Sequence, residues 1–379
     1  MLVETLAAAA SLHRKMKTLV PIKQVRVSVF TIPTDAPEAD GTLRWDTTTM
    51  VFVEIAAGDQ TGMGYTYADE SVGTLIQKSL AQLVVGNDAV DNTGIWVALL
   101  GRVRNLGRPG VASMATAAID NALWDLKAKL LGVPLVVLFG KCRERVPVYG
   151  SGGFTSYTLD QLQKQLGEWA GDGIGMVKMK VGTHPEQDVN RVRAARKAIG
   201  PGVKLFVDAN GAYSRKQALA MAERFAEFDV RWFEEPVSSD DLEGLRLLRD
   251  RAPAVMEIAA GEYGYDHYYF RRMLEAGAVD VLQADATRCE GITGFMRASA
   301  LAQAFQIPLS AHTAPSMHLH ACCALTEFRH IEYFHDHALI EHLLFEGAAK
   351  PVEGYLVPDL SRPGIGLELK RKDAQRFAA

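Results

Sequence analysis

From Val146 to about residue 354, short apolar runs alternate with amphipathic segments, and this alternation constrains the fold more than any other feature of the sequence. Eight runs have the length and composition of buried strands: VPVYG, MVKMKVG, LFVDAN, WFEEP, EIAAGE, VDVLQADA, IPLSAH and IEYF. Between them the spacing is helical, and Ser214 with Gln217 forms a capping box that opens one of the helices. Such alternation predicts a parallel sheet with right-handed crossovers, and eight units favour a closed barrel over an open sheet.

The segment before the barrel predicts a separate α+β domain. Residues 24–32 and 48–57 are rich in β-branched and aromatic residues and are separated by the turn-forming run PTDAPEADG, which indicates an antiparallel pair. Helical spacing then takes over, ending in a helix whose buried face we predict from Ile119, Leu123, Leu126 and Leu130, with Gly132 as its stop.

The polar tail from about Tyr355 is expected to return to this first domain. We therefore predict one domain over residues 20–145 plus 355–379 and a barrel over residues 146–354. Residues 1–19 are interpreted as a frayed extension, with Met16 as a candidate start.

Charge and cysteine content exclude several classes of partner. The chain has 41 Lys and Arg against 45 Asp and Glu, a formal net charge of −4, and no basic run, so nucleic acid and anionic membranes are disfavoured. No apolar stretch approaches the roughly 20 residues of a membrane span, and the first residues show the reverse of the charge order of a secretory signal. The cysteines show neither C-x-x-C nor zinc spacing, so we expect a reduced, cytoplasmic protein without disulfides. They are Cys142, Cys289, Cys322 and Cys323.

Ionisable side chains occur at or near the carboxyl end of seven strand candidates, 20 to 28 residues apart from one strand to the next. In a barrel these ends meet on one face, where the active site lies. Any one of these residues alone is more simply a satisfied core ion, but charged groups are rarely buried unless paired, so the whole set favours one shared pocket. The set comprises Lys178, Lys180, Asp208, Glu234, Glu262, Asp285, His312 and Glu332.

Three of these carboxylates, Asp208, Glu234 and Glu262, come from neighbouring strand candidates. They form a hard, all-oxygen set that suits Mg²⁺ or Mn²⁺ rather than zinc. An octahedral ion with three protein ligands keeps three positions for substrate and water. Three carboxylates and one divalent ion leave a single negative charge, so an anionic substrate needs nearby cations, which Lys178 and Lys180 supply.

The two lysines lie two residues apart on one strand and therefore point the same way, with Cα atoms roughly 6.6 Å apart. At an effective dielectric constant near 20 their charges repel by about 2.5 kcal/mol, and a metal ion acts in the same direction. We therefore expect one lysine to be neutral near pH 7 and able to act as a general base.

Asp285 and His312 lie on adjacent strand candidates, which permits a carboxylate–imidazole pair that orients the ring and raises its basicity. A lone histidine is more often a satisfied core residue, but its place at a strand end favours a second acid/base group. It would face the substrate from the side opposite Lys180.

The chain resembles the enolase superfamily and, within it, the mandelate racemase subgroup. The resemblance extends over nearly the whole length and is carried by AIDNALWDLKAKLLGVPL, the K-x-K motif in VKMKVG, VDAN, WFEEP, AGE, DATRC, SAH and IEYF. It implies an α/β fold, namely a modified TIM barrel of the (β/α)7β type with an α+β capping domain. The loop from Pro33 to Asp46 is expected to close over the substrate.

Position by position, the resemblance implies Asp208, Glu234 and Glu262 as Mg²⁺ ligands, with Glu234 preferred over Glu235. Lys180 is implied as the base on one face of the substrate. His312, paired with Asp285, is implied as the acid/base on the other face.

The remaining implied roles concern substrate binding. Lys178 would stabilise the substrate carboxylate, Glu332 would hydrogen-bond its far oxygen, and Asn210 would contact the substrate. In the closing loop, Arg44 and Asp46 are candidates to meet hydroxyls or a distal carboxylate.

The implied chemistry is abstraction of the proton α to a carboxylate, with Mg²⁺ and Lys178 stabilising the enediolate. If His312 then returns a proton from the opposite face, the result is racemisation or epimerisation; if it protonates a departing β-hydroxyl, the result is dehydration to a 2-keto-3-deoxy acid. We favour dehydration of an acid sugar, an aldonate or an aldarate, by analogy with the subgroup. The expected partner is this small carboxylate, and the chain is expected to form a homo-oligomer.

An alternative of another class is a metal-binding barrel that has lost activity. It would predict a broken acid/base set, and none of the eight positions is broken.

Some residues are left outside this interpretation. Glu290, in DATRCEGITG, stands where related sequences usually have Gly; near the pocket it would alter shape or charge, and elsewhere it would be a surface variant. The histidine-rich end of the chain lacks metal-ligand spacing, so scattered surface imidazoles are favoured over a second metal site. These histidines are His318, His320, His330, His335, His337 and His342.

Overall fold

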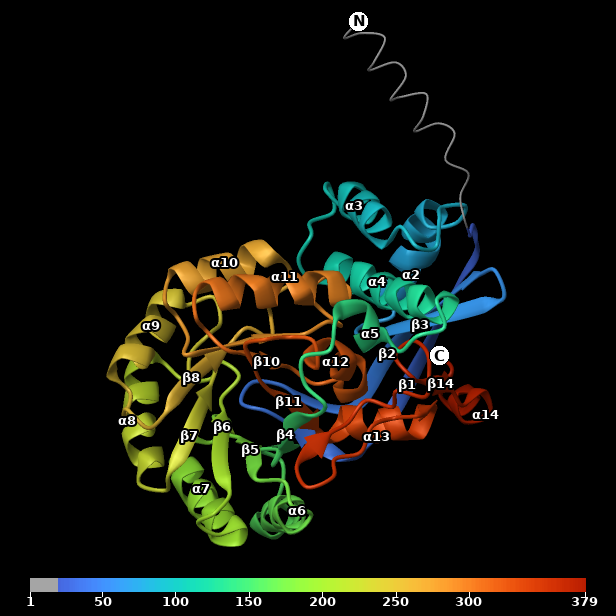
Figure 1. Cartoon of the computed structure of the whole chain (residues 1–379). Helices are drawn as coiled ribbons and strands as arrows, with labels where there is room; N and C mark the ends of the chain where they lie inside the picture. The colour runs from blue at the N-terminus through green and yellow to red at the C-terminus, as the bar shows by residue number, and fades with distance from the viewer. Residues whose placement is uncertain (1–19) are drawn as a thin grey trace, which may run out of the picture.

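A computed structural model of the chain describes residues 20–379, in which an α+β domain lies against one end of an eight-stranded barrel (Figure 1). The predicted frayed extension and the candidate start Met16 lie outside the described residues. Each of the eight predicted strands is present, neighbouring strands pair in chain order, and the last pairs with the first, so the predicted closed barrel is confirmed. The strands are β4 Val146–Gly152, β5 Met176–Lys180, β6 Lys204–Asp208, β7 Val230–Glu234, β8 Glu257–Ala260, β9 Val281–Ala284, β10 Leu309–Ala311 and β11 Phe328–Phe334.

Seven helices connect these strands and cover the outside of the barrel (Figure 1). The predicted capping box of Ser214 and Gln217 opens α8, and Thr158 and Gln161 form an equivalent box at α6. The connecting helices are α6 Leu159–Gly171, α7 Pro185–Ile199, α8 Arg215–Ala226, α9 Leu242–Arg251, α10 His267–Glu275, α11 Gly291–Ala304 and α12 Pro315–Cys322; α13, His335–Leu344, follows the last strand.

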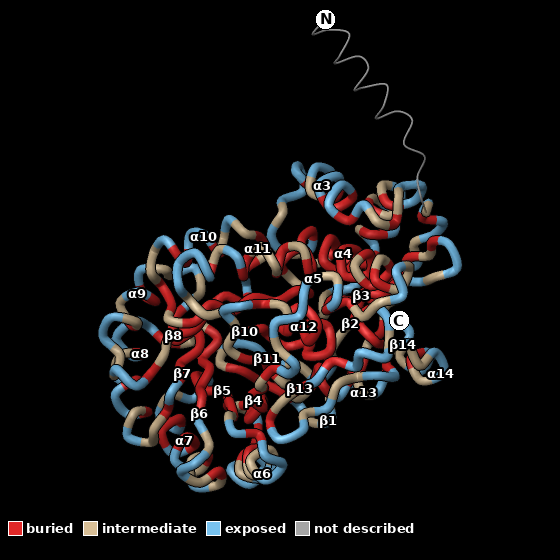
Figure 2. The backbone as a smooth tube through the Cα atoms, viewed as in Figure 1, coloured by how far each residue is buried: buried red, intermediate tan, exposed pale blue. Residues whose placement is uncertain are grey.

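Along β5, successive side chains point alternately into the apolar core outside the barrel and into the barrel itself. Val177 and Met179 point outward into the main apolar core, whereas Lys178 and Lys180 point into the barrel. Deeper in the barrel, Tyr149, Phe206 and Trp232 form an apolar layer that fills its interior. The buried strands run through the centre of the molecule in Figure 2, and the charged groups at their ends rest on this packed floor.

The α+β domain is built on the antiparallel sheet β1 Ile22–Ala39, β2 Arg44–Ala57 and β3 Gln60–Tyr67. The predicted pairing of the first two strands is confirmed. The sequence did not predict β3, because two glycines weaken its strand character. At Gly62 and Gly64 an added Cβ would lie 2.3 and 2.4 Å from backbone oxygens of α4, so close packing of the helix demands glycine there.

The helix predicted to end this domain is confirmed as α4, Val111–Leu130, and Gly132 follows it with a positive φ of 66°. It is buried on more than one face, because it also contacts the barrel: Asn121 Nδ2 donates to the carbonyl of Ala286 at 3.0 Å. The other helices of the domain are α2 Ser71–Leu75, the π-helix η1 Ile76–Leu80, the 3-10 helix η2 Ala81–Leu83, α3 Asn92–Arg102 and α5 Leu135–Phe139.

The segment from Pro33 to Asp46 is a β-hairpin rather than the predicted loop. The ladder is irregular between Pro33 and Glu38, then resumes where Glu38 faces Trp45. Contacts with the barrel hold the tip in place: the amide of Thr155 donates to the carbonyl of Ala39 at 2.8 Å, and Ser156 Oγ donates to the carbonyl of Pro37 at 2.7 Å. The prediction was wrong because these anchoring partners lie more than 100 residues away in the sequence.

The C-terminal segment contacts both parts of the molecule. Strand β13, Tyr355–Leu356, pairs with β4 of the barrel, and β14, Glu368–Leu369, pairs with β12, Phe345–Glu346. The helices α14, Arg371–Ala374, and η3, Gln375–Phe377, come last, and Ala378 bridges to Phe30 of β1. The four cysteines are free thiols. Between residues 20 and 379, none of the helices combines the apolar character and length of a membrane-spanning segment.

Candidate active site

The eight ionisable residues predicted at the strand ends converge at one end of the barrel. Neighbouring strands are in register there, with Lys180 beside Asp208 and Asp208 beside Glu234. All eight side chains are buried, and each has an ion-pair contact with another member of the set. The convergence follows from the parallel barrel, which brings the carboxyl ends of all its strands to one face.

The ligand oxygens of Asp208, Glu234 and Glu262 all lie within 4.8 Å of one another. Burial and the neighbouring Asp208 carboxylate raise the pKa of Glu234 to about 8. The lysines nearby therefore do not fully compensate the negative charge of the three carboxylates. Oε2 of Glu262 is buried and lies 3.3 Å from Nε2 of His312. A set of three carboxylates in this condition fits a hard divalent cation. Glu235 is also buried, but it is not one of these three residues, which agrees with the preference for Glu234.

Carboxylates surround both lysines. Nζ of Lys178 lies 2.8 Å from Glu332 Oε1 and 3.4 Å from Asp208 Oδ2, and it also pairs with Glu234. Nζ of Lys180 lies 2.5 Å from Asp208 Oδ2 and 3.1 Å from Asn210 Oδ1.

These contacts surround both lysines with negative charge, and the expectation that a metal ion makes one lysine neutral near pH 7 stays a prediction. Burial favours the neutral form of both side chains, but the carboxylates outweigh it and hold both pKa values above the ordinary lysine value. Lys178 does lower the pKa of Lys180, as predicted, yet this repulsion is smaller than the attraction from Asp208. The carboxylates that hold the lysines charged include Asp208 and Glu234, which a bound cation would engage instead.

The predicted pair of Asp285 and His312 is present, with 2.9 Å between Asp285 Oδ2 and His312 Nδ1. Nε2 of His312 faces Glu262 at 3.3 Å and Glu332 at 3.7 Å. Burial disfavours the charged ring, but these carboxylates outweigh burial and raise the pKa of His312 to about 9. These carboxylates therefore favour the protonated imidazole, which can donate a proton.

Glu332 is held as a carboxylate. Burial opposes its ionisation, but Lys178 and His312 overcome this and lower its pKa to about 2. Its oxygens accept hydrogen bonds from Ser151 Oγ at 2.6 Å and from the amide of Thr313 at 3.1 Å. In this state Glu332 accepts hydrogen bonds and donates none. A substrate carboxylate bound beside it would raise its pKa, which the role implied by the resemblance, donation of a hydrogen bond to that carboxylate, requires.

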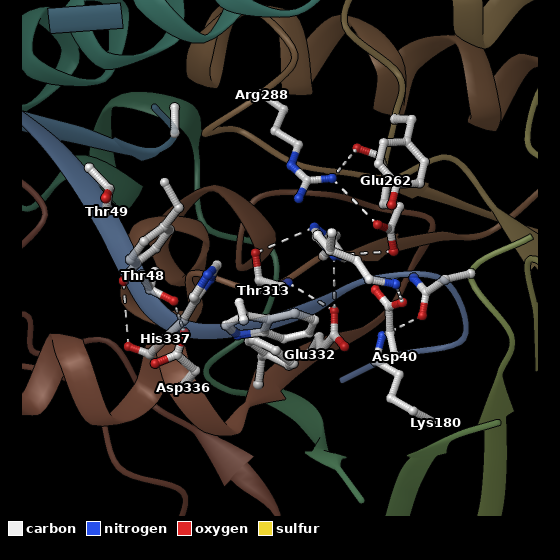
Figure 3. A pocket seen from close by; sticks show the side chains of 18 of the residues that line it. Asp40, Thr48, Thr49, Lys180, Glu262, Arg288, Thr313, Glu332, Asp336 and His337 are labelled. Atoms are coloured by element: carbon white, nitrogen blue, oxygen red, sulfur yellow. Dashed lines mark hydrogen bonds and ion pairs between the residues drawn. The ribbon is translucent and has the colours of Figure 1, made fainter. Parts of the chain in front are cut away.

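A cavity of about 420 Å³ opens above these groups, between the barrel and the α+β domain (Figure 3). Lys180, Asn210, Glu262, His312 and Glu332 line it, together with residues of the hairpin, of β3 and of α13. The predicted contacts Arg44 and Asp46 are exposed and do not line this cavity; alternation along β2 directs their neighbour Trp45 into it instead.

Arg288 is a lining residue to which the sequence interpretation gave no role. Its guanidinium lies 3.4 Å from Glu262 Oε1 and 3.7 Å from Asp285 Oδ2, so it joins the acid–base network (Figure 3). Arg288 stands three residues after Asp285 in the DATRC motif. An arginine so close behind an ionisable residue at a strand end could have indicated that it belongs to the site.

With this geometry established, comparison with known proteins identifies the family. The N-terminal domain of mandelate racemase / muconate lactonizing enzyme matches residues 25–140, and the enolase C-terminal domain-like model matches residues 161–374. The chain is a member of the enolase superfamily. Within the superfamily its relatives place it in the mandelate racemase subgroup.

Similar members of the superfamily carry out more than one reaction. The chain is 33% identical to 3,6-anhydro-alpha-L-galactonate cycloisomerase of Streptomyces coelicolor, over 94% of this chain and 99% of the relative. It is 34% identical to L-talarate/galactarate dehydratase of Salmonella typhimurium, over 87% of this chain and 85% of the relative. Relatives of this kind support an enzymatic role for the chain.

Solved structures of the superfamily share the whole fold. The Salmonella dehydratase with bound Mg and L-lyxarohydroxamate gives a TM-score of 0.87 at 30% identity and covers 95% of this chain and 93% of its own. A mandelate racemase/muconate lactonizing enzyme-like protein from Rubrobacter xylanophilus gives 0.93 at 54% identity, over 95% of this chain and 100% of its own.

Glu290, the departure from the superfamily pattern, lies neither in the cavity nor on the surface. It is fully buried with a φ of +66° at the start of α11, and Oε1 pairs with Arg108 at 2.7 Å. Its carbonyl accepts a hydrogen bond from Trp96 Nε1 at 2.9 Å. Both partners belong to the α+β domain, so Glu290 joins that domain to the barrel.

The expectation of scattered surface imidazoles at the C-terminal end is wrong. His318, His320, His330 and His337 are buried, and His335 and His342 are half-buried. His318 Nε2 accepts from the amide of Ala286 at 2.7 Å, and His330 Nδ1 lies 2.9 Å from Ser310 Oγ, so these rings are satisfied core residues. Histidine composition alone does not distinguish such a core role from a surface role.

Proposed function

We propose that this protein is a Mg²⁺-dependent acid-sugar dehydratase, which removes the proton α to the carboxylate and the β-hydroxyl to give a 2-keto-3-deoxy acid. The observation that carries the proposal is that one cavity presents Lys180 and an Asp285-supported His312 on either side of the three-carboxylate set. Lys180 ends β5, and His312 follows β10. Around the closed barrel, β11 and β4 separate these two strands in one direction and four strands separate them in the other, so the two groups approach a substrate from different directions.

Asp208, Glu234 and Glu262 would hold the cation. Mg²⁺ there would offset the negative charge that develops on the substrate carboxylate and would compete with the lysines for these carboxylates, which lowers the pKa of Lys180. Lys178, buried beneath the cavity, stabilises the same developing charge from the protein side.

Two residues move the protons. Lys180 takes the C2 proton, and the electron pair of the C–H bond passes into the carboxylate to form the enediolate. The electron pair then returns to form the C2–C3 double bond while the C3–O bond breaks, and protonated His312 gives its proton to the departing hydroxyl, which leaves as water. The enol product becomes the 2-keto acid, and Asp285 stabilises the imidazolium before this transfer.

Dehydration is preferred because the similar proteins include acid-sugar dehydratases, such as that of Salmonella typhimurium, and in this reaction His312 supplies the proton that the departing hydroxyl needs. Racemisation by the same two groups remains the second candidate. It begins with the same proton abstraction and differs in where His312 delivers its proton.

A screen of acid sugars with Mg²⁺ tests the proposal, with semicarbazide detection of 2-keto acids and polarimetry in parallel. We expect a keto product that disappears with EDTA and returns with Mg²⁺. Rotation change without keto product would support the racemase, and equal activity with and without EDTA would refute the metal role.

Glu234→Gln should abolish both activity and Mg²⁺ binding while the far-UV circular dichroism spectrum is unchanged. Glu235→Gln is the matched control, since it makes the same chemical change one residue along, outside the three-carboxylate set. We expect it to retain Mg²⁺ binding by titration calorimetry. The reverse ranking of the two variants would refute the ligand assignment.

A further inference from the structure

The two ends of the cavity differ in charge. Among the lining residues in the described part of the chain, lysine and arginine occur only as Lys180 and Arg288. Both charges belong to the barrel end, where Lys180 pairs with Asp208 and Arg288 with Glu262. In Figure 3 these two cations lie on the side of Glu262, away from the group formed by Thr48, Thr49, Asp336 and His337.

The end of the cavity away from the metal ligands is lined by hydroxyl-bearing residues of the α+β domain and by the first turn of α13. The hydroxyls come from Thr47, Thr48, Thr49 and Tyr67. Thr48 Oγ1 donates a hydrogen bond to Oδ2 of Asp336, which ties the hairpin to α13. We name this set, with Asp336 and His337, the distal wall.

His337 contributes a neutral hydrogen-bonding group to the distal wall. Its ring stacks on that of Tyr67 with centroids 3.5 Å apart and planes inclined by 14°. Burial lowers the pKa of His337 to about 3, so the ring carries no charge at neutral pH. The uncharged ring lines the cavity, whereas its Nδ1 is buried and has no hydrogen-bond partner among the described residues.

Asp336 places negative charge on the same wall. Burial raises its pKa to about 6, which leaves the carboxylate ionised above neutral pH. The neighbouring His335 side chain faces Asp35 at 2.9 Å and does not line the cavity, and no lysine or arginine of the described residues forms an ion pair with Asp336. A carboxylate accepts hydrogen bonds from sugar hydroxyls and repels a second carboxylate.

We propose that the distal wall selects acid sugars with an uncharged polyhydroxyl tail, so that the substrate is an aldonate rather than an aldarate. This inference rests on the proposed function and names its substrate class. The single substrate carboxylate lies at the barrel end, and the hydroxyls at the far end of the chain donate to Asp336 and lie against the uncharged ring of His337.

Pairs of sugars that differ only at the far carbon test the proposal: gluconate with glucarate, galactonate with galactarate and mannonate with mannarate. For the pair that reacts best we expect kcat/KM to favour the aldonate by at least about 100-fold, because unpaired like charges cost several kcal/mol. An aldarate turned over as well as its aldonate partner would overturn the inference and leave the dehydratase proposal standing.

A binding measurement separates the two proposals. Titration calorimetry with Mg²⁺ and the Lys180→Ala variant reports affinity without turnover. Suppose that aldonates bind this variant more tightly than aldarates and that the parent enzyme forms no keto product from any sugar. That result would support the distal wall and refute the dehydratase proposal. Absence of binding by both classes would refute both.

Variants of the wall assign the effect to residues. Asp336→Asn should reduce the aldonate preference at least about 10-fold by admitting a second carboxylate. Asp35→Asn, an acid nearby that lies outside the cavity, is the matched control and should leave the preference unchanged. An equal change of the aldonate preference in both variants would show that the overall negative charge of this region, and not the distal wall, sets the preference. His337→Gln keeps a neutral hydrogen-bonding group and should retain the preference, whereas loss of it would count against the role given to that ring.

Discussion

Replacing Glu290 by Gln should stabilise this protein in neutral and alkaline solution and have little effect in acid. The side chain is fully buried, and only Oε1 has a hydrogen-bond partner, Arg108; Oε2 has none among the described residues. Burial raises the pKa of Glu290 to about 7 in spite of Arg108. The ordinary pKa of a glutamate is 4.5.

The direction and magnitude of this change in stability follow from the difference between the pKa of Glu290 in the folded and unfolded protein. A group whose pKa is higher in the folded protein contributes stability below its unfolded pKa and loses it as the pH rises through the folded value. Ionisation of Glu290 therefore costs the folded state about 3 kcal/mol by pH 8. Glutamine keeps the acceptor for Arg108 and removes the charge, so Glu290→Gln should raise the melting temperature by about 4 °C above pH 8 for a chain of this length.

Thermal unfolding of parent and variant at one scan rate, from pH 4.5 to 8.5, measures this difference. The gap should widen between pH 4.5 and about 7 and then stay constant. Glu275→Gln is the matched control, because Glu275 is an exposed glutamate paired with Arg271, and its gap should stay near zero throughout. A gap for Glu290→Gln that does not change with pH would refute the reasoning.

A second variant isolates backbone strain. Glu290 has a left-handed φ of +66°, which costs roughly 1 kcal/mol for a residue with a side chain. At pH 4.5 or below, Glu290→Gly should still exceed Glu290→Gln in stability because only glycine relieves that strain.

Two further predictions concern the acid–base groups. In D₂O with Mg²⁺ and a substrate, Lys180→Ala and His312→Asn should each lose α-proton exchange on one face, as read by proton NMR; exchange that survives in the double variant would contradict the assignment. Asp285→Asn removes a carboxylate that raises the pKa of His312, so the alkaline limb of kcat/KM should move to lower pH, and an unchanged limb would show that His312 is not the acid.

The barrel and the convergence of the ionisable side chains could be predicted because their signals are local. Alternation along β5 directs Lys178 and Lys180 inward irrespective of the rest of the chain, and a run of strand–helix units places successive strand ends on one face. The resemblance then assigned the individual roles. Geometry reproduces the grouping, with Asp208, Glu234 and Glu262 together and Asp285 beside His312.

The failures involve partners distant in the sequence. Strand β3 was missed because it contains glycines, which the close packing of α4 requires. The hairpin was missed because residues of the barrel loops hold it in place. Glu290 could not be placed because its partner Arg108 lies 182 residues away. The protonation of Lys180 could not be derived from the sequence, because a pKa depends on distances to carboxylates on other strands and spacing along one strand does not give them.

The charge of the assembled site links the reaction to the substrate proposed for it. When all are ionised, the five carboxylates Asp208, Glu234, Glu262, Asp285 and Glu332 face the four cations Lys178, Lys180, Arg288 and His312. The groups of the protein alone then carry one negative charge, or two when Lys180 is neutral and able to act as the base, and a divalent cation brings the site to one positive charge or to none. The site therefore offsets one substrate carboxylate at most, and a second would add an uncompensated anion in a buried site, beside Asp336. The same balance that draws a monoacid to the barrel end thus opposes a diacid, independently of the shape of the cavity.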